Sequence, residues 1–490
     1  HRFRARALLK LILARVLAPL DYAVIAAYLA AITAFGSWFG RFQHTTRDYF
    51  LSGHSVPWWA VCCTVVATET STLTFIGIPA TAYTGNMTFL QLALGYIIGR
   101  LIVSSLFIPA YFRGDLMTSY ELLHRRFGRR VTSLSAGLFL VTRSLADGIR
   151  LFATSIVISV VTGVPTEWST LIVGAVMILY TVRGGAAAVI WTDVVQMFVY
   201  VAGAAVVAFA LLGRIPGGWD EVVRTGTAAS KFTFLDLSTD LSAVYTLWTG
   251  LLGGVALTLA THGTDQFLVQ RLLAATSARA AATGLVLSGV IVFAQFILFL
   301  LIGVMLFTFH QYVPLAEPLA RTDQVLPHFV VNFLPSGVAG FIVAAIVAAA
   351  LSPSLNAMAA TTINDFYKPR ATRVLDEAAM LRLSRRITIF WGVVQIGVAL
   401  GAEFMDRSVL DAGLAVLSLA SGAVLGAFIL ATSLPSVGER EAWAGMIVGL
   451  AAMLAVWGLT MVAFTWYVFI GAFTTVATAW TLSRLRPERA

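Results

Sequence analysis

A run of polar residues interrupts one of the most apolar stretches of this chain. Residues 67–74 read ATETSTLT, in which six of the eight residues are polar and one is the carboxylate Glu69, and the run lies between apolar VCCTVV and FIGIPA. Hydrocarbon does not tolerate an exposed carboxylate or unpaired backbone groups, so such a run must line a cavity enclosed by protein. The run therefore predicts a site for an ion or a polar solute in the middle of a membrane.

A second apolar segment carries three charged residues, Arg143, Asp147 and Arg150, whose spacing places them on one helix face. Arginine binds carboxylate or phosphate groups through a bidentate fork, so this face is a candidate contact for an anionic group of a solute. The same spacing allows an internal Arg–Asp–Arg clamp, which is the interpretation we favour. Arg100, near the end of another segment, is expected to extend its head to the membrane interface.

The elements that position these residues are predicted from composition. Hydrophobic residues make up 59% of the 490 residues, charged residues make up 12%, and the mean hydropathy is +0.85, which excludes an ordinary soluble domain. About a dozen stretches approach the ~20 residues that span a bilayer. The predicted fold class is an all-α integral membrane protein with about 13 transmembrane helices. The predicted spans are residues 20–41, 57–83, 87–110, 131–161, 168–186, 189–213, 242–268, 278–309, 333–364, 387–403, 409–434, 442–461 and 463–483.

Basic clusters predict how these helices cross the membrane. They follow the third span at residues 125–130, the ninth at 368–386 and the last at 484–489. With an odd number of spans these loops fall on one side, which the positive-inside rule makes cytoplasmic. We therefore predict a multi-pass protein of the cell's inner (plasma) membrane with a cytoplasmic C-terminus. The five basic residues within 1–15 oppose the external N-terminus that this arrangement requires.

Two interrupted spans suggest an internal repeat. The second span breaks at the polar run, and the seventh is rich in glycine (Gly250, Gly253, Gly254) and ends in THGTDQ. Five spans separate the starts of these two segments. Broken helices in corresponding positions of two five-helix halves are typical of inverted-repeat transporters, whose site lies between the halves.

Four longer motifs resemble the sodium/solute symporter family, which includes the sodium/galactose, proline, iodide and sialic acid symporters. They are RDYFLSGHSVPWWA, YTVRGGAAAVIWTDVVQ, DQFLVQRLLA and LSPSLNAMAATTINDFYKP, in the family's order, and the resemblance covers about residues 47–435. The resemblance implies a leucine-transporter-type 5+5 inverted repeat with broken first and sixth core helices, and transport by alternating access.

The same resemblance implies how the chain is divided. The expected parts are a basic N-terminal segment (1–19), an accessory helix (20–44), a first core repeat (45–215), an external loop (216–241), a second core repeat (242–434), and C-terminal accessory helices with a cytoplasmic tail (435–490).

The family's sodium site uses carbonyls of the broken first core helix and two hydroxyl residues on the eighth. The carbonyl positions match Ala67 and Thr70, but the hydroxyl pair falls on Ala349 and Ala350, so both hydroxyls are missing. Methyl groups cannot replace oxygen ligands. Pro353 lacks an N–H, so it either exposes the carbonyl of Ala349 to an ion or simply kinks the helix.

Other oxygen ligands remain on the chain. Asp193 matches the carboxylate of a second sodium site, Gln196 lies near it in sequence, and Ser352 aligns with a residue of that site. Glu69 aligns with an aspartate that serves sodium in the proline symporter. It can bind Na⁺, hold a cationic group of the solute, carry a proton, or be satisfied by hydroxyls or an arginine. We hypothesise that cation binding survives through Glu69, Asp193 and Ser352.

Solute contacts are expected around the first break. Thr74 aligns with a glutamine that contacts solute in several family members, and Gln91 is a candidate by proximity. Gln266 has a counterpart in the iodide symporter, although the cluster it forms with His262 and Asp265 could equally be a gate or a helix cap. His262 is expected to be a hydrogen-bonding residue rather than a proton carrier.

The predicted function is a secondary-active symporter that imports a small polar organic solute, with Na⁺ as the coupling ion and H⁺ as the alternative. An uncoupled facilitator and a membrane solute sensor are competing interpretations. No nucleophile–base pair, metal-ligand cluster or phosphate loop is apparent in the sequence, which argues against an enzyme. The expected partners are the solute and the lipid bilayer, with no nucleic acid and no obligatory protein partner.

Overall fold

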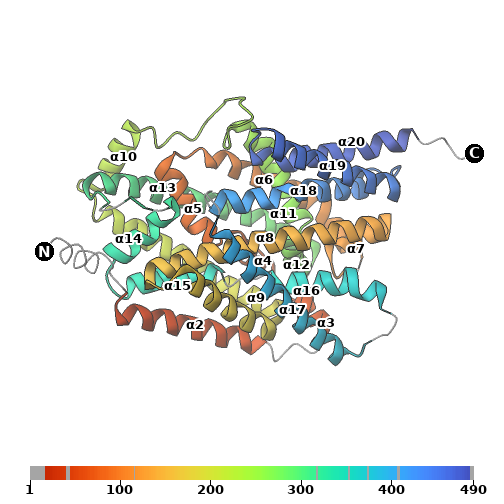
Figure 1. Ribbon diagram of the computed structural model, residues 1–490, viewed down its shortest axis with the longest axis horizontal. Coiled ribbons are helices and arrows are strands. Elements are labelled where there is room, and N and C mark those ends of the chain that lie inside the picture. Colours follow the sequence, from red (N-terminus) through yellow and green to blue (C-terminus); the bar gives the residue numbers. More distant parts are fainter. Residues whose placement is uncertain are drawn as a thin grey trace, which may run out of the picture.

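Helices form nearly all of the regular structure of this chain (Figure 1). The structure is a computed structural model that describes residues 17–39, 45–114, 116–315, 318–319, 321–350, 354–371, 375–404 and 409–485. Among those residues there is no β-strand element, and one isolated bridge pairs Val56 with Ala275. The predicted all-α class is confirmed. The basic segment 1–16, Ser352 and Pro353 lie outside the described residues.

The helices differ widely in length. In chain order they are α2 (Pro19–Phe39), α3 (Thr46–Leu51), α4 (Trp58–Glu69), α5 (Thr72–Thr84), α6 (Phe89–Phe112), α7 (Ser119–Phe127), α8 (Arg129–Thr162), α9 (Thr166–Leu212), α10 (Gly218–Ala228), α11 (Val255–Gly263), α12 (Gln266–Leu273), α13 (Ala278–Tyr312), α14 (Val325–Phe333), α15 (Val338–Ala350), α16 (Leu355–Thr361), α17 (Glu377–Ala402), α18 (Val409–Ser433), α19 (Glu439–Leu459) and α20 (Tyr467–Arg484). The π-helices η3 (Thr249–Gly254) and η5 (Thr362–Tyr367) adjoin α11 and α16.

Eight of the described helices are long and apolar enough to cross a membrane, or nine when the bent pair α4–α5 is taken as one span. Two predicted spans are joined in α9, which bends at Gly185 with φ 60° and ψ −171°. Glycine adopts this conformation without the steric cost that other residues meet. The apolar helices Thr166–Leu179 and Val338–Val347 are shorter than a full span. The count of thirteen therefore stays a prediction.

The predicted break in the second span is present. α4 ends at Glu69, α5 begins at Thr72, and their axes differ by 61°. A continuous helix would direct the amide of Ser71 to the carbonyl of Ala67, but this amide donates to the carbonyl of Glu69 at 3.1 Å. Hydroxyl side chains compete for backbone groups and favour such interruptions. The carbonyl of Ala67 thus loses its helical donor at the centre of the fold.

The second interrupted segment lies against α6. The π-helix η3 opens it, α11 continues it, and the chain turns at Thr264 and Asp265 before α12 begins. Glycines on both sides let the backbones touch, because a Cβ built on Gly95 would lie 2.0 Å from the carbonyl oxygen of Gly250. This contact packs η3 and α11 directly against α6.

Gly95→Ala is expected to destabilise the protein by at least about 2 kcal/mol, since the new methyl group would force α6 away from η3. The matched control is Gly458→Ala in α19, where an added Cβ meets nothing within 4 Å. That change should be neutral or stabilise by about 0.5–1 kcal/mol, because alanine loses less backbone entropy in a helix. Melting curves of the detergent-solubilised proteins test the contrast. Equal melting temperatures for the two variants would refute the contact.

The first and last of the described helices, α2 and α20, lie along opposite long sides of the molecule (Figure 1). α2 packs on α9 and α15, and the Asp21 carboxylate accepts the amides of Gly337 at 2.6 Å and Gly340 at 2.8 Å. α19 and α20 pack on each other and on α18. This placement is compatible with accessory helices around a core, and the boundaries of the parts remain predictions.

Candidate solute and ion site

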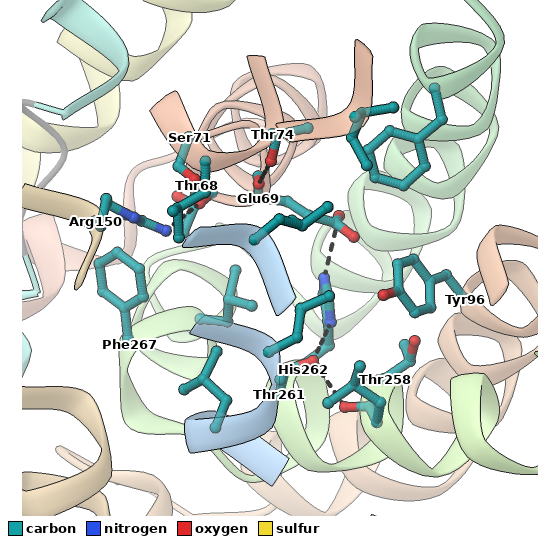
Figure 2. A pocket seen from close by; sticks show the side chains of 18 of the residues that line it. Thr68, Glu69, Ser71, Thr74, Tyr96, Arg150, Thr258, Thr261, His262 and Phe267 are labelled. Atoms are coloured by element: carbon teal, nitrogen blue, oxygen red, sulfur yellow. Dashed lines mark hydrogen bonds and ion pairs between the residues drawn. The ribbon is translucent and has the colours of Figure 1, made fainter. Parts of the chain in front are cut away.

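A cavity of about 120 Å³ opens at the break between α4 and α5 (Figure 2). Its walls come from α4, α5, α6, α8, α11, α12, α13 and α18. Three predicted solute contacts line it, namely Glu69, Thr74 and Arg143. The polar run therefore lines a cavity, as its composition predicted.

Hydroxyl groups surround much of this cavity. Besides Thr74, whose Oγ1 donates to the carbonyl of Glu69 at 3.0 Å, they are contributed by Thr68, Ser71, Tyr96, Thr258 and Thr261. The last three belong to α6 and α11 and were not predicted, because single hydroxyls in apolar segments carry no periodic pattern. These hydroxyls can donate hydrogen bonds to a solute or accept hydrogen bonds from it.

An apolar wall completes the cavity. Leu410, Leu414 and Leu417 of α18 lie at i, i+4 and i+7, and Phe89 and Phe296 add two rings. The sequence did not reveal this wall, since α18 is apolar on most of its surface and no face stands out. A solute held here must offer the wall an apolar part.

Glu69 is paired inside the protein. Its carboxylate forms an ion pair with Arg100 of α6, and the Nε2 atom of His262 lies 3.6 Å from Oε2 of Glu69 and 3.3 Å from Nη2 of Arg100. Nδ1 of His262 lies 2.9 Å from Oγ1 of Thr261. The interpretation of Glu69 as a carboxylate satisfied by an arginine fits this arrangement, and His262 has the expected hydrogen-bonding role.

The expectation for Arg100 was wrong. Its side chain is 0% exposed and turns inward to Glu69 instead of extending to the interface. The reason is electrostatic, because a carboxylate inside the membrane domain needs a partner and a buried arginine supplies one.

The clamp on α8 is confirmed and is larger than predicted. Nη1 of Arg143 lies 3.4 Å from Oδ1 of Asp147, and Nε of Arg150 lies 4.0 Å from the same oxygen. Arg143 also forms an ion pair with Asp265, which caps α12. The ring of Phe267 lies under the guanidinium groups of both arginines, at 4.7 and 5.8 Å from its centroid.

Asp193, a predicted cation ligand, is also paired with an arginine. Nη2 of Arg271 lies 3.2 Å from its Oδ2, and the hydroxyl of Thr64 donates to the same oxygen at 2.6 Å. Gln196, which follows Asp193 in sequence, is also buried. Its Nε2 has no hydrogen-bond partner among the described residues. The sequence pattern did not single out Arg271, although it belongs to the motif DQFLVQRLLA.

The remaining cation candidates lie around the break and the end of α15. The hydroxyl of Thr72 donates to the carbonyl of Ile346 at 2.9 Å, which brings this end of α15 to the break. Ala349 and Ala350 are the last residues of α15, and Ser352 follows outside the described residues. The Ala67 carbonyl, which has lost its helical donor, is the kind of oxygen that coordinates Na⁺ in broken helices. A sodium site at this break stays a prediction.

Three predicted solute contacts lie outside the lining of this cavity: Asp147, which belongs to the clamp on α8, and the amides of Gln91 and Gln266. Gln91 donates to the carbonyl of Tyr245 at 3.2 Å and accepts the amide of Asp236 at 3.1 Å, which ties the loop after α10 to α6. Gln266 accepts the amide of Ser119 at 2.7 Å and donates to the carbonyl before α7 at 3.3 Å. Both amides are engaged by backbone groups, as buried amides usually are.

Comparisons with known proteins agree with this geometry. The family model of the Sodium:solute symporter family matches residues 49–449. The sodium/iodide cotransporter of Homo sapiens is 31% identical over 444 residues, covering 89% of this chain and 69% of that protein. Sodium-coupled monocarboxylate transporter 1 of Xenopus laevis is 29% identical over 445 residues, covering 89% of this chain and 71% of that protein.

A solved structure is similar over nearly its whole length. It is the substrate-bound outward-open state of a Na⁺-coupled sialic acid symporter, with a TM-score of 0.88, 27% identity, and coverage of 96% of this chain and 98% of the other. The broken α4–α5 helix, the cavity at its break and the match over residues 49–449 lead to one conclusion. The chain belongs to the sodium:solute symporter family and is an integral membrane transporter, not an enzyme.

Proposed function

We propose that this protein is a Na⁺-coupled symporter that imports a small organic anion with an apolar body, by alternating access. The observation that carries the proposal is the position of Arg150 in the cavity at the helix break (Figure 2). Its side chain is 13% exposed, compared with 4% or less for the side chains of Arg100, Arg143 and Arg271. Of the two arginines that line the cavity, Arg143 and Arg150, the second has the more exposed side chain.

Arg150 also has hydrogen-bonding capacity to spare. It donates to the carbonyl of Thr68 at 3.1 Å, which caps the end of the broken helix, and its nearest carboxylate oxygen is 4.0 Å away on Asp147. A guanidinium has five N–H donors, so one carbonyl leaves room for a bidentate contact with a carboxylate. Ser71 lines the same cavity, and its hydroxyl can donate a further hydrogen bond to an oxygen of that carboxylate.

Among the described residues, the charged side chains that line the cavity or pair next to it balance. Four arginines (Arg100, Arg143, Arg150, Arg271) face four carboxylates (Glu69, Asp147, Asp193, Asp265), with histidine counted as neutral. Net charge is costly inside a membrane domain. One Na⁺ and one monoanion entering together preserve the balance, whereas either alone upsets it. This supports coupled transport of the two and fits relatives named for iodide, monocarboxylate and sialic acid transport.

Sodium is proposed as the coupling ion because the relatives are named as sodium-coupled proteins; nothing in them supports the proton. The proposed ligands are the carbonyls of Ala67, Thr70 and Ala349 with Asp193, Gln196 and Ser352. Glu69 is removed from this set in our proposal, because both Arg100 and His262 contact its carboxylate. Asp193 is kept because it matches the carboxylate of the family's second sodium site, although Arg271 pairs with it.

We further propose ten core helices in two inverted repeats, residues 45–215 and 242–434, in the inner membrane with a cytoplasmic C-terminus. The two interrupted segments, one ending at α5 and one beginning at η3, support the repeat. The arginines at residues 125–130 and 382–386 support the orientation.

Uptake by reconstituted protein tests the proposed function. Proteoliposomes with an inward Na⁺ gradient should accumulate labelled pyruvate, an anion at neutral pH, and should not accumulate uncharged pyruvamide of nearly equal shape. Replacing the external Na⁺ with choline should abolish accumulation, and protein-free liposomes correct for leakage. Equal uptake of acid and amide would overturn the proposed substrate class. If pyruvate only equilibrates across the membrane, at a rate that does not depend on Na⁺, the protein is a facilitator instead.

A further inference from the structure

The positively charged side chain of Arg100 lies behind the cavity wall and does not itself line the cavity. Arg100 is 0% exposed and forms its ion pair with Glu69, whose side chain is 13% exposed and does line the cavity. Nε and Nη1 of Arg100 have no hydrogen-bond partner among the described residues. Within the described part of the chain, Glu69 is thus the carboxylate with which Arg100 pairs.

The fold makes specific room for this arginine. A Cβ added at Gly289 of α13 would lie 2.9 Å from Cδ of Arg100, so the arginine stem occupies space that only a glycine leaves open. The neighbouring His262 adds a ring nitrogen that also contacts Glu69, at 3.6 Å. Three helices, α6, α11 and α13, therefore cooperate to hold a positive charge against one carboxylate of the cavity.

The charge of Glu69 matters to any solute in the same cavity. An uncompensated carboxylate would attract cations and repel the anion that Arg150 faces, and water-poor surroundings strengthen both effects. A like charge within a few ångströms also opposes the ionised form of a bound acid. With Arg100 behind it, Glu69 presents a hydrogen-bonding oxygen without net charge at this wall.

We propose that Arg100 is a specificity-determining residue that sets the charge preference of the cavity by cancelling Glu69. The wall at the helix break is then neutral, Arg150 dominates the cavity, and anions are preferred over cations. This inference rests on the proposed function for the identity of the preferred solute, but the cancellation of charge is testable without it.

Ligand-induced thermal stabilisation of purified protein in constant Na⁺ provides the test, with pyruvate as the anion probe and propylammonium as the cation probe. The variants are Arg100→Gln, Glu69→Gln and the double variant Glu69→Gln/Arg100→Gln. The matched control is Glu221→Gln/Arg224→Gln, which removes an Arg–Glu pair of α10 at 2.6 Å, remote from the cavity. In that control pair, hydrogen bonds from Arg224, Tyr312 and Thr225 lower the pKa of Glu221 to about 2, so it is charged in every buffer used.

Arg100→Gln is expected to weaken the apparent affinity for pyruvate at least tenfold and to create a measurable affinity for propylammonium. The double variant, which has a neutral pair again, should return pyruvate affinity to within threefold of the unsubstituted protein and lose the response to propylammonium. Glu69→Gln should bind pyruvate more tightly, because Arg100 then adds an uncompensated positive charge. The control variant should match the unsubstituted protein with both probes.

Several outcomes would overturn the inference. One is an Arg100→Gln protein that binds pyruvate with unchanged affinity and is not stabilised by propylammonium. Another is a double variant whose affinity for pyruvate is no higher than that of Arg100→Gln. If Arg100→Gln does not fold, the Glu69→Gln variant provides the test. An affinity of that variant for pyruvate equal to that of the unsubstituted protein refutes the charge argument. If the unsubstituted protein ignores pyruvate but Arg100→Gln gains propylammonium binding, the proposed substrate fails while the role of Arg100 stands.

Discussion

Arg150→Gln is expected to lower the kcat/KM of Na⁺-driven pyruvate uptake by about 10- to 100-fold. Hydrogen bonds to charged groups contribute about 1.5–3 kcal/mol, and each 1.4 kcal/mol corresponds to a factor of ten. Glutamine retains donors but has neither the charge nor the planar fork that matches a carboxylate. The effect should appear mainly at low pyruvate concentration, since the interaction binds the solute in its resting state.

Arg150 also caps the carbonyl of Thr68, so its removal can disturb the break itself. Two further variants separate the roles. Arg150→Lys keeps the charge without the fork and should retain an intermediate rate, whereas Arg224→Gln removes an exposed arginine on α10 and should transport normally. Melting temperature and Na⁺-induced stabilisation, measured on every variant, identify general damage to the fold. An Arg150→Gln protein with unaltered pyruvate uptake would refute the role of this arginine.

Asp193→Asn is expected to have the second large effect, on both stability and sodium binding. The carboxylate is fully buried and pairs with Arg271 at 3.2 Å. Removing one partner of a buried ion pair leaves the other charge uncompensated, at a cost of about 3–5 kcal/mol. The loss of a carboxylate oxygen should also abolish any stabilisation that is specific to Na⁺, since an amide attracts a cation far less strongly.

The double variant Asp193→Asn/Arg271→Gln separates these two consequences. It leaves no unpaired charge, so most of the stability should return, while the sodium effect should remain absent. Melting curves in NaCl, KCl and choline chloride measure both quantities, with Glu221→Gln/Arg224→Gln as the control pair. If the double variant still shows the full Na⁺-specific shift, Asp193 is not a sodium ligand, and the site must consist of the carbonyls at the break and at the end of α15.

Two ion pairs near the cavity link helices far apart in the chain. Arg271 and Asp193 are 78 residues apart, and Arg100 and Glu69 are 31 apart. Sequence alone placed Glu69 and Asp193 among the cation ligands on the basis of their position in motifs. The structure shows that each already faces an arginine, which changes the expected role of Glu69 from cation ligand to part of a neutral pair.

The sequence by itself determined the features that depend on local chemistry. The membrane class follows from overall hydropathy, and the break at residues 67–74 follows from hydroxyl side chains that compete with helical hydrogen bonds. The clamp of Arg143, Asp147 and Arg150 follows from helical periodicity, which puts residues three and four apart on one face. The break and the clamp each involve residues within about two helical turns of one another, and the membrane class needs composition alone.

Only the tertiary structure decided which of these residues share a cavity. The inward turn of Arg100, the apolar wall of α18 and the backbone contacts of Gln91 and Gln266 all depend on how the helices pack. Apolar segments in a membrane protein carry little periodic contrast between faces, so the sequence does not show which side of a helix meets which neighbour. Helix packing fixes those contacts, and with them the charge of the site.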